Sequence, residues 1–109
     1  MSKLIKKVEL NDLLKDDQSL MIGGFLNCGT PKELISIIHA EDLKNLTLIA
    51  NDTGILGDDM SSLIVEKRVK KVITSHIGTN SETGKQMNNQ EIEVELVPQG
   101  TLVERIRAK

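Results

Sequence analysis

The stretch "MIGGFLNCGTP", residues 21–31, holds the most concentrated set of residues suited to ligand binding. Three glycines and a proline separate an apolar run from a helical pattern, and glycine allows backbone to come close to a bound group. The segment from Gly24 to Gly29 has the glycine spacing of a phosphate-binding P-loop, but Thr30 and Pro31 stand where Lys and Ser/Thr are required. The dinucleotide-binding spacing G-x-G-x-x-G also fails. Two interpretations remain: a tight turn, or a helix N-terminus near Thr30 that favours an anion such as a carboxylate.

Gln99 is the second residue suited to chemistry. It follows Pro98 and precedes Gly100 at the expected end of a strand. A side-chain amide in that position can donate a hydrogen bond to the negative oxygen that develops during acyl transfer. An ordinary turn residue explains the position equally well.

A nucleophile is harder to find. Cys28 is the single cysteine, and a lone cysteine is more often a small buried residue than a catalytic group. His39 falls late in a predicted helix, where it favours the negative C-terminal end. With one cysteine and two histidines far apart, no metal site is predicted. The chain therefore offers binding groups without a convincing nucleophile or general base.

The elements that must position these groups follow from the spacing of apolar residues. We expect helices over 4–15, from Thr30 to Ala40 and over 102–109, and strands over 20–25, 46–52, 71–78 and 92–98. Residues 60–68 are interpreted as a short helix or an irregular turn. Thr30 as the N-cap and Glu33 three residues later would form a capping box. Pro31 would be the first helical residue. The polar stretch 79–91 is interpreted as a loop or a frayed helix.

This alternation of strands and helices predicts an α/β fold with a mostly parallel sheet. In such sheets, ligands gather at the carboxyl ends of the strands. Small and polar residues are concentrated at these ends, namely 23–25, 51–53, 76–78 and 98–100. The sequence therefore predicts a site along this edge of the sheet, while Glu91, Glu93 and Glu95 are interpreted as solvated edge or interface charges.

Composition limits the class of protein. The chain has 109 residues, a single aromatic residue and a net charge of −2, so we expect one domain with an aliphatic core. Without a basic face or stacking aromatics, nucleic-acid binding is not expected. The sequence shows no signal peptide and no apolar run of membrane-spanning length. A soluble, cytoplasmic protein is the expectation.

The stretch "DQSLMIGGFLNCGTP", residues 17–31, resembles the α-subunit signature of the family I coenzyme A transferases, G-G-F-x-x-x-G-x-P after an apolar run. Segments 46–54, 69–87 and 94–108 resemble the same subunit, so the resemblance covers nearly the whole chain. It suggests acetate/acetoacetate (butyrate) and succinyl-CoA:3-oxoacid CoA-transferases as the nearest relatives. The implied fold is a mostly parallel sheet with flanking helices, shared with sugar-phosphate isomerase-like proteins.

The resemblance implies transfer of coenzyme A between a short-chain acyl-CoA and a carboxylate of the acetate, butyrate, acetoacetate or succinate class. The implied route is ping-pong, through a glutamyl-CoA thioester whose glutamate belongs to a β subunit. Gln99 is implied to hydrogen-bond the reacting carbonyl, and Asn51 to lie at the rim of the site. The implied substrate-binding residues are Gly23, Gly24, Phe25, Gly29, Asn51 and Gly100.

The resemblance also implies partners. Coenzyme A thioester enters as a substrate with no separate cofactor, and the partner is a β subunit in an assembly of two α and two β subunits. Since α subunits of the family continue beyond "ERIRA", residues 1–109 are expected to form a single incomplete domain, its N-terminal half. Alone, it should be inactive, with exposed apolar faces and self-association. The alternatives are a catalytically inactive assembly module and a sugar-phosphate isomerase-like binder.

Overall fold

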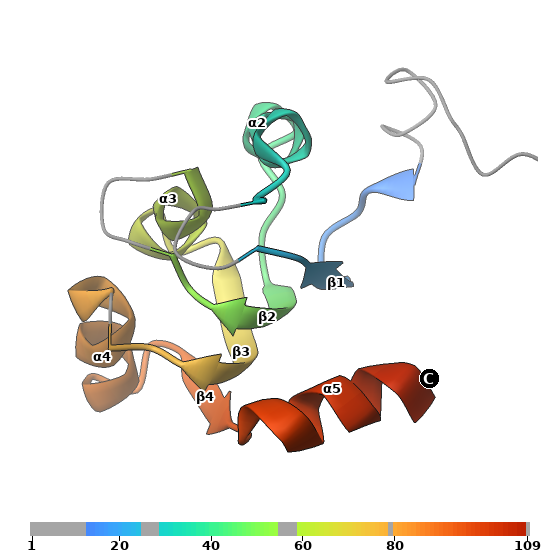
Figure 1. Ribbon diagram of the computed structural model, residues 1–109. Helices are drawn as coiled ribbons and strands as arrows, with labels where there is room; N and C mark the ends of the chain where they lie inside the picture. The colour runs from blue at the N-terminus through green and yellow to red at the C-terminus, as the bar shows by residue number, and fades with distance from the viewer. Residues whose placement is uncertain (1–12, 25–28, 55–58, 79, 109) are drawn as a thin grey trace, which may run out of the picture.

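A computed structural model describes residues 13–24, 29–54, 59–78 and 80–108. Strands and helices alternate along it: β1 (Ser19–Ile22), α2 (Lys32–Ala40), β2 (Leu46–Asp52), α3 (Asp59–Val65), β3 (Val69–His76), α4 (Ser81–Asn88), β4 (Glu93–Leu96) and α5 (Gln99–Ala108). The four strands form one parallel sheet in the order β1-β2-β3-β4, with helices on both faces (Figure 1). The predicted α/β class is confirmed.

The sheet places its helices by a simple rule of handedness. Each strand pairs in parallel with the one before it, and crossovers between parallel strands are right-handed. Because the sheet grows in one direction without reversing, the three crossover helices α2, α3 and α4 lie on the same face (Figure 1). Helix α5 follows the last strand and lies against the opposite face, in contact with β3.

Strand β2 illustrates how the sequence builds the two faces. Alternate residues Leu46, Leu48 and Ala50 are buried beneath the crossover helices, while Thr47, Ile49 and Asn51 are half-buried on the face of α5. A period of two is the signature of a pleated strand. The polar group Asn51 therefore points to the side on which α5 lies.

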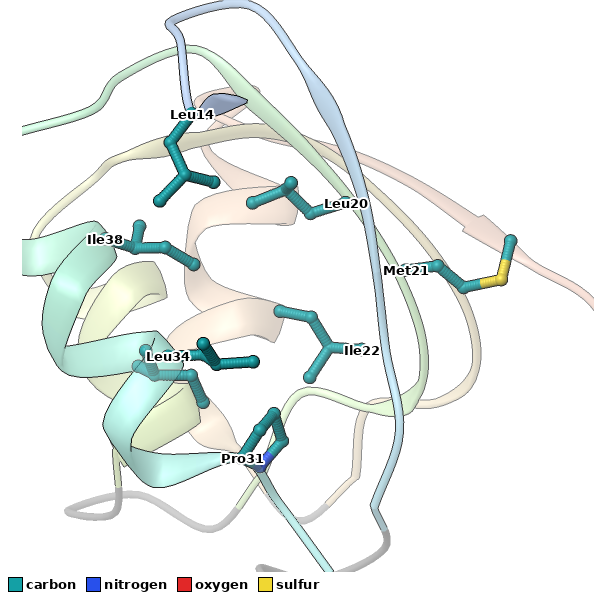
Figure 2. Close-up of a pocket in the computed structure, with 8 residues that line it drawn as sticks. Leu14, Leu20, Met21, Ile22, Pro31, Leu34 and Ile38 are labelled. Carbon is teal, nitrogen blue, oxygen red and sulfur yellow. The ribbon is translucent and has the colours of Figure 1, made fainter. Parts of the chain in front are cut away.

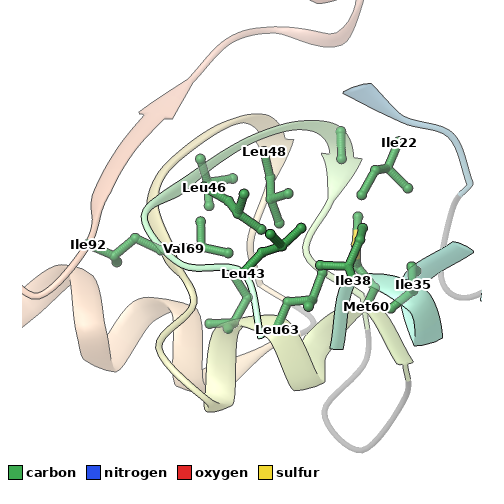
Figure 3. Packing of buried hydrophobic residues seen from close by; sticks show 13 residues of the cluster. Ile22, Ile35, Ile38, Leu43, Leu46, Leu48, Met60, Leu63, Val69 and Ile92 are labelled. Carbon is green, nitrogen blue, oxygen red and sulfur yellow. The ribbon is translucent and has the colours of Figure 1, made fainter. Parts of the chain in front are cut away.

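The core lies between the sheet and its three crossover helices (Figure 3). Leu48 and Val72 from the central strands meet Ile35 and Leu63 from the helices, and each of these side chains is almost fully buried. Every member of the cluster is aliphatic, as the composition predicts. Burial of such side chains stabilises a fold by roughly 1.5–3 kcal/mol each.

Two predictions about helix ends were wrong. Helix α2 begins at Lys32, with Pro31 as its N-cap and no side-chain cap, because Pro31 has a non-helical ψ of 81°. Thr30 therefore lies one residue too early to cap the helix. Helix α5 begins at Gln99 rather than Leu102, since the amide of Leu102 already donates to the carbonyl of Pro98 at 2.9 Å.

The polar stretch 79–91 contains a defined helix, α4, where a loop or frayed helix was expected. Asn80 caps it, accepting hydrogen bonds from the amides of Glu82 and Thr83. Thr83 and Gln86 are the buried residues of this helix, so polar contacts hold a helix that has little apolar surface. Of the two alternatives for 60–68, the short helix is confirmed as α3, whereas most of the helix expected over 4–15 lies outside the described residues. None of the described helices is long and apolar enough to span a bilayer.

Candidate functional site

Three residues singled out from the sequence are joined by hydrogen bonds at the carboxyl edge of the sheet. Gln99 Nε2 donates to Asn51 Oδ1 at 2.7 Å, across 48 positions of sequence. Asn51 Nδ2 donates in turn to the carbonyl oxygen of Gly24 at 2.8 Å. The first turn of α5, the end of β2 and the segment after β1 are thereby tied into one polar cluster, which we call the amide relay.

Strand register explains why these groups meet. Ala50 pairs with Thr74 and Asp52 with His76, so the intervening residues Asn51 and Ser75 are neighbours on the face of α5. The Gln99 side chain reaches this pair from the start of α5. Parallel strands bring their carboxyl ends to one edge, as the sequence argument assumed.

Ser75 belongs to this cluster and was missed by the sequence analysis. Its Oγ donates to Gln99 Oε1 at 2.5 Å or to the carbonyl oxygen of Asn51 at 2.8 Å. Thr74 Oγ1 also donates to that carbonyl, at 2.8 Å. The available signal was the position of Ser75 near the end of a predicted strand, but its proximity to Gln99 depends on register and helix placement.

An apolar hollow of about 330 Å³ lies beside the amide relay. Asn51 and Gly23 lie at its polar side, and Met21, Ile49 and Ile106 supply apolar wall. A site with an apolar wall and a few convergent polar groups is typical of small-molecule binding. We call it the carboxyl-edge hollow.

The predicted glycines differ in what their backbone requires. Gly24 has a φ of 119° and Gly29 a φ of 76°, both in the region that favours glycine, and a Cβ on Gly29 would lie 4.0 Å from Gly24 Cα. Gly23 and Gly100 have open space around the position of a Cβ. Phe25 and Cys28 lie outside the described residues, so the structure places neither of them.

A second apolar groove, of about 200 Å³, lies between β1 and α2 (Figure 2). Leu20, Ile22 and Ile38 point into it, whereas Met21 points to the other side of β1. The residues that line it are all apolar, so this groove holds no side-chain group for acid–base or acyl chemistry.

A Ser–His–Glu arrangement joins α2 to α3. His39 Nε2 lies 2.5 Å from Ser62 Oγ, and His39 Nδ1 lies 3.2 Å from Glu66 Oε2. The distances are those of a hydrolytic triad, but Ser62 sits within the body of a helix and no cavity described above includes any of the three residues. We interpret this cluster as a link between two helices.

The acidic residues near the last strand are paired surface charges. Glu95 on β4 lies 2.6 Å from Arg105 of α5 and 3.8 Å from Lys71 of β3. The hydrogen bond from Arg105, together with the attraction of both cations, lowers the pKa of the Glu95 carboxyl. Glu91 pairs with Lys67, which agrees with the predicted edge charges. In the part of the chain that the structure describes, no group of three His, Cys, Asp or Glu side chains could hold a metal ion.

Comparison with known proteins places this chain in a family. The family model described as "Coenzyme A transferase" matches residues 5–108. The chain is 53% identical over 107 residues to the acetoacetyl-CoA:acetate/butyrate CoA transferase alpha subunit of Clostridium acetobutylicum, covering 98% of this chain and 49% of the relative. It is 46% identical over 106 residues to the acetate CoA-transferase subunit alpha of Escherichia coli, covering 97% and 48%.

The fold has a counterpart among solved structures. A crystal structure of a variant of the decarboxylase AibA/AibB matches 92% of this chain and 40% of that chain, with a TM-score of 0.73 and 18% sequence identity. The chain spans about half the length of the curated relatives it matches. The match over residues 5–108 and the close relatives establish that the chain belongs to the coenzyme A transferase family.

Proposed function

We propose that this chain supplies the acyl-binding part of a CoA-transferase α subunit that moves coenzyme A between a short-chain acyl-CoA and a carboxylate. The amide relay beside the carboxyl-edge hollow is the observation that carries the proposal. The hollow offers apolar wall for a short acyl chain, and the relay offers an amide donor for its carbonyl oxygen. The names of the curated relatives support this substrate class.

Gln99 has the donor that such a reaction needs. A primary amide carries two N–H groups, and one of them is used in the bond to Asn51. The second is available for the thioester carbonyl oxygen, whose negative charge grows as the tetrahedral intermediate forms. A fixed donor stabilises this oxyanion more than the neutral carbonyl, which lowers the barrier.

The nucleophile is proposed to come from a partner. The amide relay consists of amides, a hydroxyl and backbone carbonyls, without an ionisable side chain. We propose that a glutamate of a β subunit attacks the acyl-CoA, and that a glutamyl-CoA thioester then passes coenzyme A to the second carboxylate. Each half-reaction would form an oxyanion within reach of Gln99. Coenzyme A takes part as a substrate, and no further cofactor is required.

The test uses a whole α subunit. Residues 1–108 are joined to the second half of the C. acetobutylicum relative and coexpressed with the β subunit of that relative. We expect the purified complex to transfer coenzyme A from acetoacetyl-CoA to acetate. The unaltered relative with its β subunit is the control for assembly and assay.

Absence of transfer from every short-chain acyl-CoA donor, in a complex that assembles normally, would contradict the proposal. A second candidate, an assembly module without turnover, is favoured by the exposure of Met21 on the face of α5. It predicts co-purification with the β subunit and no activity, so the same experiment separates the two.

A further inference from the structure

We propose that Ser75 is a positioning residue, which holds the amide of Gln99 so that an N–H group faces the acyl carbonyl. The inference rests on the proposed function, because it assigns a role within the same site. It starts from the 2.5 Å contact between Ser75 Oγ and Gln99 Oε1, which the family resemblance did not predict.

The carbonyl of Gly24 sets which way the side-chain amides of the relay face. A backbone carbonyl only accepts hydrogen bonds, so the carbonyl of Gly24 requires the Nδ2 group of Asn51. Asn51 Oδ1 must then face Gln99, and it requires the donor Nε2. Both amides are therefore oriented by one backbone oxygen.

This leaves Gln99 Oε1 in need of a donor, and Ser75 provides it. The Ser75 hydroxyl has one proton and two acceptors in reach, Gln99 Oε1 and the Asn51 carbonyl. The contact with Gln99 Oε1 is the shorter of the two, and the Asn51 carbonyl also lies 2.8 Å from Thr74 Oγ1, so we assign the Ser75 proton to Gln99. Within the described residues, Ser75 is the donor that reaches this oxygen.

The arrangement matters because Gln99 is an exposed residue at the start of a helix. A long exposed side chain samples many rotamers, and holding it in one of them has an entropic cost. Two hydrogen bonds, one at each end of the amide, keep Gln99 against the sheet. Loss of the Ser75 hydroxyl would leave this oxygen to accept hydrogen bonds from water and allow the side chain to turn into solvent.

The experiment compares Ser75→Ala, Gln99→Ala and the double variant in the assembled α/β complex. Ser75→Ala should lower kcat about tenfold, with little change in KM for the acyl-CoA, because a positioned hydrogen bond is lost. In the Gln99→Ala background the same change should alter kcat less than about twofold, since Ser75 acts through Gln99. Ser75→Thr keeps a hydroxyl and should restore most of the rate.

A readout independent of turnover tests the positioning itself. Side-chain amide protons of Gln99, followed by NMR in the complex, should exchange faster with solvent in Ser75→Ala than in the unaltered chain. Ser36→Ala is the matched control, because Ser36 is exposed on α2 and its hydroxyl donates to the carbonyl of Lys32 in its own helix. It should change neither exchange nor kcat.

Three results would overturn the inference. They are an unchanged kcat in Ser75→Ala, an equal loss from Ser75→Ala with and without Gln99, and unchanged exchange of the Gln99 amide. A complex without any CoA transfer would instead refute the proposed function, while altered exchange of Gln99 in that complex would still establish that Ser75 holds the amide.

Discussion

At the scale of single residues, the site depends on which face of a strand each side chain occupies. Asn51 and the buried Asp52 are adjacent in sequence but point to opposite faces of β2. The polar pair that the sequence analysis recognised is therefore divided between two environments. Only Asn51 reaches the amide relay, while an oxygen of Asp52 accepts the amide of Gly54 at 3.1 Å.

Gln99→Ala should lower kcat of the complete complex by roughly 10²-fold, the effect of losing one donor to an oxyanion. The reason is that the N–H group proposed to face the carbonyl disappears. Steady-state kinetics with acetoacetyl-CoA and acetate would measure it. Thr101→Ala, an exposed change in the same helical turn, is the control and should leave kcat unaltered. Equal rates for Gln99→Ala and the unaltered chain would remove Gln99 from the mechanism.

The residues of the site were predictable to different degrees. Gln99, Asn51 and Gly24 stood out because amides and glycines follow apolar strands, and strand ends share an edge. Ser75 did not stand out, since serine is common in many contexts. Its role depends on the register of β2 with β3 and on the approach of α5. Such information is non-local, and spacing along one chain does not contain it.

At the scale of elements, helix α4 is held against the rest of the molecule by buried polar side chains, a task that apolar residues usually perform. Its cap, Asn80, is almost fully buried and donates to the carbonyl of Thr53 at 3.0 Å, while Thr83 donates to Thr53 Oγ1 at 2.9 Å. The residues of this stretch are mostly polar, and polar patterns usually indicate loops. The sequence analysis left a loop and a frayed helix open here, because the partners that hold the helix come from the segment after β2, far away in the chain.

Asn80→Ala should lower the free energy of unfolding by about 2 kcal/mol, because a helix cap and a buried hydrogen bond are both lost. Urea unfolding followed by circular dichroism would measure the change. Asn88→Ala, an exposed substitution in the same helix, should have little effect. Comparable unfolding midpoints for the two variants would contradict a structural role for the cap.

Helix α5 is linked to β4 by a charge pair whose strength depends on pH. Because Arg105 lowers the pKa of Glu95, the pair contributes above the ordinary pKa of a carboxyl group. Its contribution is lost as the pH falls through the lowered pKa of Glu95. An NMR titration should give a Glu95 pKa below the ordinary value, rising towards it in Arg105→Gln.

Arg107→Gln is the matched control for that titration, since Arg107 pairs with Glu104 within the same helix. It should leave the pKa of Glu95 where it is. A Glu95 pKa that is the same in all three proteins would show that the pair between α5 and β4 does not form in solution.

At the scale of the whole molecule, the two faces of the sheet are covered unequally. Three helices bury one face, while α5 contacts the other mainly through β3. Met21 of β1 remains half exposed there, beside Ile49, Ile73 and Ile106. The predicted class and element order follow from local periodicity, but this asymmetry follows from topology.

The exposed face predicts self-association when residues 1–109 are produced alone, since contiguous apolar surface favours burial. Sedimentation velocity should show species larger than a monomer, and Met21→Lys should shift the distribution towards the monomer. Val65→Lys replaces a comparably exposed residue at the end of α3 and should have little influence. An identical distribution for Met21→Lys and the unaltered chain would exclude this face.

The order of the strands also determines which contacts can form first while the chain is being synthesised. Each strand pairs with the one made just before it, so the sheet can extend one strand at a time as the chain leaves the ribosome. Gln99, by contrast, must wait until β4 is complete before it can bind Asn51, made 48 residues earlier. A nascent chain can therefore pair β1, β2 and β3 before Gln99 has been made, and at that stage Asn51 still lacks its partner in the amide relay.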